Sequence, residues 1–326
     1  MRTRYELSAC PVCATSDHAV VADADAIRAE VEALWEHHAG DGRPAIPEAQ
    51  LLDRVTFTQD FPLQIVRCTG CGLLFRNPRE RDVRAIYAAE QVEEASLEKL
   101  RAAQLDAFHA AVARLTDLHG GPGRVLEVGS YVGAFLEAAR TAGWQAHGID
   151  VNPHAVAFAR RFGHDVAAGA IEDSPATGRF DAIAFWNCFD QLPDPVAAAR
   201  AARERLRPGG FVVVRVPNGE LYLTLRTRLH GPLGGAARAL LARHNLLGFP
   251  YRHGFTRTSL RGLLERCGFV VIDEQDAGVL PTEDGDSGLG GEQLLAAAER
   301  ALRPLVGPPW LEVYAIRDRR RVRRDS

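Results

Sequence analysis

Four of the six cysteines stand in two C-x-x-C pairs, a spacing at which thiolates bind metal ions. The pairs are Cys10 with Cys13 and Cys68 with Cys71. Each pair can present two thiolates to one ion, and two pairs complete a tetrahedral Zn²⁺ site. The alternatives are two unrelated pairs or a redox-active dithiol, but a dithiol needs no second pair. A site closed by four thiolates has no open position for water, so we expect the zinc to be structural.

The two pairs are 54 residues apart, whereas a plain zinc ribbon separates them by roughly 15–20. Apolar residues at helical spacing predict a helix over residues 23–38, and residues 55–68 read as two short strands. We therefore predict a small zinc-binding module with a helical insert over residues 1–80. A helical linker over residues 81–119 is expected to follow. Two helices are predicted in and around this linker, at residues 76–90 and 94–120.

A glycine loop flanked by acidic residues indicates a cofactor site. A short apolar strand leads into the loop Gly129–Gly133, a helix follows, and the next strand ends at Asp150. Such a unit holds a nucleotide cofactor at the carboxyl ends of its strands. A pyrophosphate needs glycine where Tyr131 stands, and Glu127 precedes the loop. Both features favour a cofactor without phosphate and with a cationic amino-acid end, which describes S-adenosylmethionine (SAM). Asp150 would then accept hydrogen bonds from the ribose hydroxyls.

Five motifs in order resemble those of the class I SAM-dependent methyltransferases, over roughly residues 120–318. The motifs are EVGSYVG at 127–133, GIDVNPHAVAFAR at 148–160, AGAIEDSP at 168–175, FDAIAFWNCFD at 180–190 and LRPGG at 206–210. The cysteine pairs, with the run RCTGCGLLFRNP, resemble bacterial members that carry an N-terminal zinc-binding segment. The resemblance implies a SAM-dependent methyltransferase as the activity.

The resemblance also implies which residues contact SAM. They are Glu127, Gly129, Ser130, Tyr131, Gly133, Asp150, Val151, Ile171, Glu172 and Asn187. Many relatives have an acid that touches the adenine amine where this chain has Ala170. Adenine recognition is therefore expected to rest on the backbone near Ile171 and on Glu172.

Two residues are candidates for a catalytic base. Methyl transfer depends mainly on holding the acceptor in line with the methyl group, and a base is needed only if the acceptor loses a proton. The acid–histidine pair frequent after the fourth strand of the family is replaced here by the segment 188–191. The candidates are His253, ahead of a predicted helix, and Asp190. The alternatives are that His253 caps or braces that helix and that Asp190 is a helix-entry residue.

Seven apolar segments predict the strands of one sheet. They are residues 124–129, 146–151, 165–169, 180–187, 210–217, 268–275 and 311–317. The first five alternate with helices and the last two form a pair. This predicts an α/β fold with a doubly wound, Rossmann-like sheet, mostly parallel with one late antiparallel strand. We assign residues 120–326 to this domain, with a lid-like insertion of two helical stretches at residues 219–250. The alternative for the insertion is a plain surface helix pair.

Composition narrows the class of acceptor. The 326 residues carry 39 Lys plus Arg and 42 Asp plus Glu, a net charge of −3, which argues against a nucleic-acid partner and favours a small molecule. No apolar run is long enough for a membrane span, and the first residues lack a secretory signal, so we expect a cytoplasmic protein. Two other functions stay open, a methyltransferase acting on RNA or protein and a non-catalytic scaffold. The oligomeric state is left open.

Overall fold

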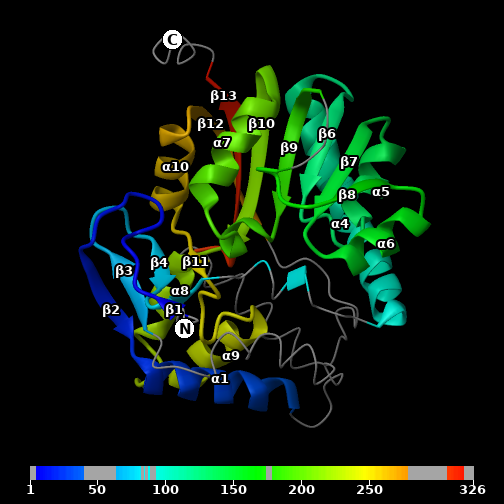
Figure 1. The fold of residues 1–326 in the computed structure, drawn as a ribbon. Helices are drawn as coiled ribbons and strands as arrows, with labels where there is room; N and C mark the ends of the chain where they lie inside the picture. Colours follow the sequence, from blue (N-terminus) through cyan, green and yellow to red (C-terminus); the bar gives the residue numbers. More distant parts are fainter. Residues whose placement is uncertain are drawn as a thin grey trace.

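The computed structural model describes residues 5–39, 64–81, 84, 87–88, 93–173, 178–277 and 307–318. Figure 1 shows a large sheet covered by helices on both faces and a smaller sheet, with further helices, near the N-terminus. The first of the two strands predicted within residues 55–68 lies outside the described residues. No helix in these ranges has the length and apolarity to cross a bilayer.

The large sheet has seven strands in the order β12-β13-β10-β9-β6-β7-β8. Their bounds are β6 (Arg124–Val128), β7 (Gln145–Asp150), β8 (Asp165–Ala168), β9 (Phe180–Trp186), β10 (Leu206–Pro217), β12 (Phe269–Ala277) and β13 (Trp310–Arg317). β13 runs antiparallel to both of its neighbours, β10 and β12, and the other pairs in this sheet are parallel. All seven residues of β9 are buried, as expected for a parallel strand covered on both faces. The predicted fold class is confirmed.

Helices cover the two faces of this sheet with separate cores. One core contains α4 (Glu94–His119), α5 (Ala134–Thr141) and α6 (Pro153–Arg161), and the other contains α7 (Pro195–Arg205) and α10 (Arg257–Arg266). Val125 belongs to the first core and Leu126 to the second, because side chains alternate along a strand. The helix predicted at residues 94–120 is confirmed as α4.

The smaller sheet has the order β11-β4-β3-β2, and β11 at its edge comes from far along the chain. Its strands are β2 (His18–Ala22), β3 (Ile65–Cys68), β4 (Leu74–Arg76) and β11 (His253–Gly254), and β1 (Tyr5–Glu6) pairs separately with β5 (Arg79–Glu80). The helix predicted at residues 23–38 is confirmed as α1 (Ala24–Ala39). The helix predicted at 76–90 is wrong at its start, because pairing with β1 and β3 places β4 and β5 there.

The insertion at residues 219–250 contains α8 (Gly219–Arg226) and α9 (Gly234–Arg243). Its apolar side chains share one core with α1, β3 and β4. The buried carboxylate of Glu30 ties these parts together, because it accepts hydrogen bonds from Tyr222 OH at 3.1 Å, Arg226 Nε at 3.0 Å and Gly248 N at 2.9 Å. The insertion is therefore packed on the N-terminal part of the chain, and Figure 1 shows α1 beside α9.

Candidate cofactor site and cysteine cluster

The predicted glycine loop joins β6 to α5 and has backbone geometry that favours glycine. Gly129 and Gly133 have φ angles of +71° and +74°, which residues with a side chain rarely adopt. A Cβ atom on Gly129 would lie 3.0 Å from Cys188 Cβ, and one on Gly133 would lie 2.8 Å from His164 Cδ2. Both positions therefore require glycine for conformation and for space.

Asp150 is held by the backbone at the end of β7. Its Oδ2 accepts a hydrogen bond from Tyr131 N at 2.9 Å, and its Oδ1 accepts one from Asn152 N at 2.8 Å. Burial raises the pKa of Asp150, and hydrogen bonds from the backbone N–H groups of Asn152, Tyr131 and Val151 oppose that effect. The carboxylate is thus fixed between the glycine loop and the start of α6, with further lone pairs available to a ligand.

Glu127 is a second carboxylate at the same edge of the sheet. It is 3% exposed, and its Oε2 has no hydrogen-bond partner within the described residues. Burial raises the pKa of Glu127 well above its usual value, and the nearby charge of Asp150 adds to this. Burying a carboxylate without a partner is costly. The pair therefore suits a ligand that brings an ammonium or hydroxyl group to this point.

The other predicted cofactor residues lie at neighbouring strand ends. Ser130 Oγ and Asn187 Oδ1 are buried atoms without a hydrogen-bond partner in the described part of the chain. Ile171 is 1% exposed and follows β8. Glu172 forms an ion pair with Arg84, from Oε2 to a terminal guanidinium nitrogen, at 3.3 Å. The carboxyl ends of β6, β7, β8 and β9 thus bring the predicted residues together, as the parallel topology requires.

Asp190 lies in the short helix η1 (Phe189–Gln191) directly after β9. It is 1% exposed, and its Oδ1 has no hydrogen-bond partner among the described residues. Burial raises its pKa to about 7. Asp190 does not begin the next helix, because Asp194 caps α7 by accepting hydrogen bonds from Val196 N and Ala197 N.

His253 is fully buried in β11, and its Nε2 lies 3.0 Å from Leu192 O. A carbonyl only accepts, so Nε2 carries the hydrogen and Nδ1 of the neutral ring keeps its lone pair. Nδ1 has no partner in the described ranges. Burial lowers the pKa of His253 well below its usual value, and the charges of Arg252 and Arg79 lower it further. Thr256, not His253, caps α10.

Cys188 is central to this site, although its sequence context predicts no role for it. Its Sγ donates to Val128 O at 3.0 Å, beneath Gly129. Burial raises the pKa of the Cys188 thiol well above its usual value, and the carboxylates of Asp190, Asp150 and Glu127 raise it further. The thiol is therefore neutral, and three acidic side chains lie near enough to act on it electrostatically. The one sequence signal for a role of Cys188 is its position just after β9, at the carboxyl end of a parallel strand.

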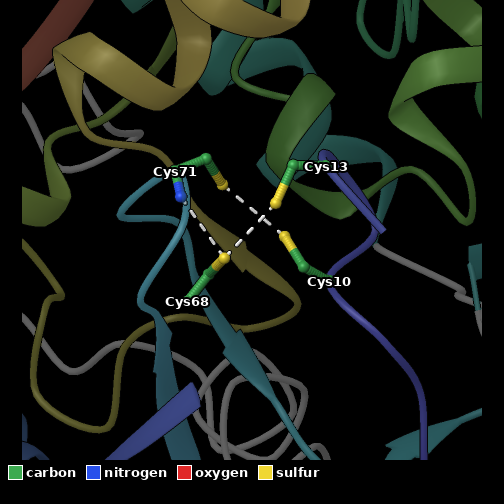
Figure 2. A group of neighbouring side chains, drawn as sticks. All are labelled: Cys10, Cys13, Cys68 and Cys71. Atoms are coloured by element: carbon green, nitrogen blue, oxygen red, sulfur yellow. Dashed lines mark hydrogen bonds between the residues drawn. The ribbon is translucent and has the colours of Figure 1, made fainter. Parts of the chain in front are cut away.

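Figure 2 shows the four cysteine side chains pointing to a common centre. Cys10 and Cys13 come from the segment between β1 and β2, Cys68 is the last residue of β3, and Cys71 lies in the turn between β3 and β4. Cys10 Sγ lies 3.6 Å from Cys71 Sγ, Cys13 Sγ lies 3.4 Å from Cys68 Sγ, and all four sulfur atoms lie within 4.8 Å of one another. Zinc with Zn–S bonds of about 2.3 Å needs sulfur atoms about 3.8 Å apart. The cluster therefore fits the ion.

A family model described as a methyltransferase domain matches residues 98–274. The chain belongs to this methyltransferase domain family. Among curated relatives, the ubiquinone biosynthesis O-methyltransferase of Xanthomonas oryzae pv. oryzae strain PXO99A is 37% identical over 114 residues, which cover 32% of this chain and 46% of the relative. A protein of the same name from Xylella fastidiosa is 36% identical over 106 residues, or 30% and 43% of the two chains. The chain thus spans about half the length of the curated relatives it matches.

Two solved structures also resemble this chain. SAM-bound CalS10, an amino pentose methyltransferase from Micromonospora echinaspora, is 27% identical over 33% of this chain and 49% of its own, with a TM-score of 0.31. Phosphoethanolamine N-methyltransferase 2 of Haemonchus contortus is 14% identical over 76% of this chain and 63% of its own, with a TM-score of 0.49.

Proposed function

We propose that this chain is a SAM-dependent methyltransferase that acts on a small-molecule acceptor. The observation that carries the proposal is the pair of buried carboxylates, Glu127 and Asp150, at the ends of adjacent strands around a glycine loop. Glu127 has an oxygen without a partner in the described structure, and Asp150 is fixed by two backbone N–H groups. Membership of the methyltransferase domain family agrees with this assignment.

In this proposal each strand end contacts a different part of SAM. Asp150, with the adjacent Val151, accepts the ribose hydroxyls, and Glu127 faces the amino-acid end. Gly129, Ser130, Tyr131 and Gly133 form the loop beside it. Residues after β8 and β9 complete the site, with Ile171 and Glu172 at the adenine and Asn187 near the methyl group. Glu127 is the residue most in need of such a ligand, because burial without a partner disfavours its charged form.

Bound SAM would supply a methyl group that is attached to a sulfonium ion. After transfer of the methyl group the leaving group is a neutral thioether, which needs no acid to protonate it. The protein has to orient the acceptor and, for a hydroxyl or acidic carbon, accept its proton. His253 is the first candidate because its ring is neutral at pH 7 and its buried Nδ1 has no hydrogen-bond partner in the described structure. Asp190 is the alternative base, since a pKa of about 7 leaves much of it ionised near neutrality.

Two observations favour a small acceptor. The relatives with the printed name of ubiquinone biosynthesis O-methyltransferase are 34–37% identical over the matched stretch, and that name describes a small-molecule pathway. The net charge of −3 gives no general attraction for a polyanion such as RNA. The site of transfer, oxygen, nitrogen or carbon, is left open by both observations.

Zinc at Cys10, Cys13, Cys68 and Cys71 would have a structural role in this proposal. Cys10 and Cys68 are buried in the same core as Leu260 and Leu263 of α10. Contact with the Cys71 thiol lowers the pKa of Cys10. The ion would fasten the N-terminal turn to the face of the methyltransferase domain that carries α10.

Calorimetric titration of SAM into the purified chain tests the proposal. We expect one site per chain, and Asp150→Asn should weaken binding by about 10- to 100-fold, since hydrogen bonds to a charged group are worth about 1.5–3 kcal/mol. Asp106→Asn, at a fully exposed side chain of α4, is the matched control and should leave the affinity unchanged. SAM binding that is absent, or equal in the wild type and Asp150→Asn, would show the proposal to be wrong.

A further inference from the structure

Next to His253, the structure buries a guanidinium group that no carboxylate neutralises at close range within the described residues. Arg252 is 6% exposed, and its side chain makes one hydrogen bond to these residues, from a terminal nitrogen to Glu80 O at 2.9 Å. Its Nε is buried without a partner in the same ranges. Glu80 thus offers Arg252 its backbone carbonyl, and its carboxylate acts only at longer range. Burying a cation in this state is unfavourable unless an anion joins it.

A second guanidinium adds to the positive charge at this point. Arg79, in β5, lies close enough to act electrostatically on both Arg252 and His253. Glu6 is the carboxylate paired with Arg79, at 3.2 Å, and it also serves Arg81 at 3.1 Å. Glu6 thus contacts two cations, and neither of these ion pairs includes Arg252.

The location links this positive charge to the acceptor. Arg252 immediately precedes His253, whose Nε2 contacts Leu192 O just after η1. Asp190 lies in η1, and its charge acts on the Cys188 thiol together with those of Asp150 and Glu127. The guanidinium groups of Arg252 and Arg79 act instead on His253. A ligand that spans from these acids to Arg252 would meet opposite charges at its two ends.

We propose that Arg252, supported by Arg79, binds a carboxylate or phosphate group of the methyl acceptor. This inference rests on the proposed function, because it names the class of molecule that enters beside His253. A guanidinium fork matches the geometry of either oxyanion and favours two parallel hydrogen bonds. Such a fork is formed by Nε, which has no partner among the described residues, and the terminal nitrogen that does not bind Glu80 O.

Anion binding at Arg252 would also affect His253. The positive charges of Arg252 and Arg79 act together with burial to lower the pKa of His253. An oxyanion on Arg252 would offset part of this effect and make Nδ1 more basic when the acceptor is present. The acceptor's charge would therefore both position the acceptor and strengthen the neighbouring base.

Binding of simple anions, measured by calorimetry at low ionic strength without SAM, tests this inference. The probes are phenyl phosphate and benzoate, with phenol as the neutral control, and the preferred anion distinguishes a phosphate from a carboxylate acceptor. The variants are Arg252→Gln, which removes the charge, and Arg252→Lys, which keeps the charge but loses the fork. Arg28→Gln is the matched control, because Arg28 is 67% exposed on α1 and pairs with Asp25.

We expect the wild type and Arg28→Gln to bind one of the two anions and not phenol. Arg252→Gln should weaken that binding by about tenfold or more, with Arg252→Lys between the two. Arg252→Gln should also melt at the same temperature as the wild type or higher in anion-free buffer, because it removes a buried uncompensated charge. The anion should raise the melting temperature of the wild type and leave that of Arg252→Gln unchanged.

Three results would overturn the inference. They are no anion binding to the wild type, equal binding to Arg252→Gln, and a lower melting temperature of Arg252→Gln with anion binding retained. The last result would mean that Arg252 only braces β5. A parallel titration with S-adenosylhomocysteine separates failure of the anion site from failure of the proposed function. Cofactor binding without anion binding rejects the anion site alone, and anion binding without cofactor binding rejects the proposed cofactor.

Discussion

Replacing Asp190 by asparagine should change how the stability of the protein depends on pH. Asp190 is 1% exposed, and its Oδ1 has no hydrogen-bond partner among the described residues. Burial raises its pKa from an ordinary 3.8 to about 7. The asparagine side chain has a similar shape but no ionisable group. The difference between the two proteins therefore isolates the cost of ionising one buried carboxyl group.

The expected magnitude follows from linkage between protonation and folding. The folded state holds the Asp190 proton more tightly than the unfolded chain does, so its stabilising effect is complete below pH 3.8 and is lost as the pH rises through about 7. A difference of about 3 pH units at about 1.4 kcal/mol each makes the ionised form cost about 4 kcal/mol. Between pH 5 and pH 8.5 the wild type should lose about 2.5 kcal/mol relative to Asp190→Asn.

Urea unfolding followed by tryptophan fluorescence at about pH 5 and pH 8.5 measures this difference. Asp106→Asn, at a fully exposed position of α4, controls for the loss of one negative charge. The comparison within each pH removes any other titrating group that the two proteins share. A stability difference between wild type and Asp190→Asn that is the same at both pH values would refute the reasoning.

Three further perturbations test other parts of the structure. Glu30→Ala should lower the free energy of unfolding by about 3–5 kcal/mol, because the buried donors that Glu30 binds would lose their acceptor. The control Glu32→Ala, on the exposed side of α1, should change the free energy of unfolding by about 0.5 kcal/mol or less. Gly129→Ala should destabilise the fold by about 1–3 kcal/mol and weaken SAM binding, because of its φ of +71° and the nearby Cys188. Gly235→Ala, with open space in α9, should instead stabilise by about 0.5–1 kcal/mol. Metal analysis should give about one zinc per chain, and a chelator should lower the melting temperature; a metal-free protein with an unchanged melting curve would contradict the zinc site.

The large sheet could be predicted well because its signals are local. The strand before Gly129, the helix after Gly133 and the strand ending at Asp150 each have their own apolar pattern and turn residues. Parallel topology then requires their carboxyl ends to meet. The approach of the two cysteine pairs was also predictable, since metal chemistry joins two pairs that have 54 residues between them without any need to know the structure of those residues.

The remainder depends on contacts between distant segments. The local pattern places Arg76 at the start of a helix, but pairing of β4 with β3 and with β11 makes it the end of a strand. β11 has two residues and no strand pattern of its own. The core shared by α1 and the insertion at 219–250 could not be inferred either, because each amphipathic helix accepts many partners. A binding role for Arg252 could not be predicted from the sequence, because it follows from the burial that these contacts create.

A crystal structure of the chain with S-adenosylhomocysteine, the product that SAM would leave, tests the cofactor site most directly. We predict the ribose hydroxyls within hydrogen-bond distance of the Asp150 carboxylate and the ammonium group on the side of Glu127. We also predict that the sulfur atom points toward the space between Asn187 and His253. A ligand bound elsewhere, or bound here without contacting either Glu127 or Asp150, would contradict the assignment of this edge of the sheet as the cofactor site.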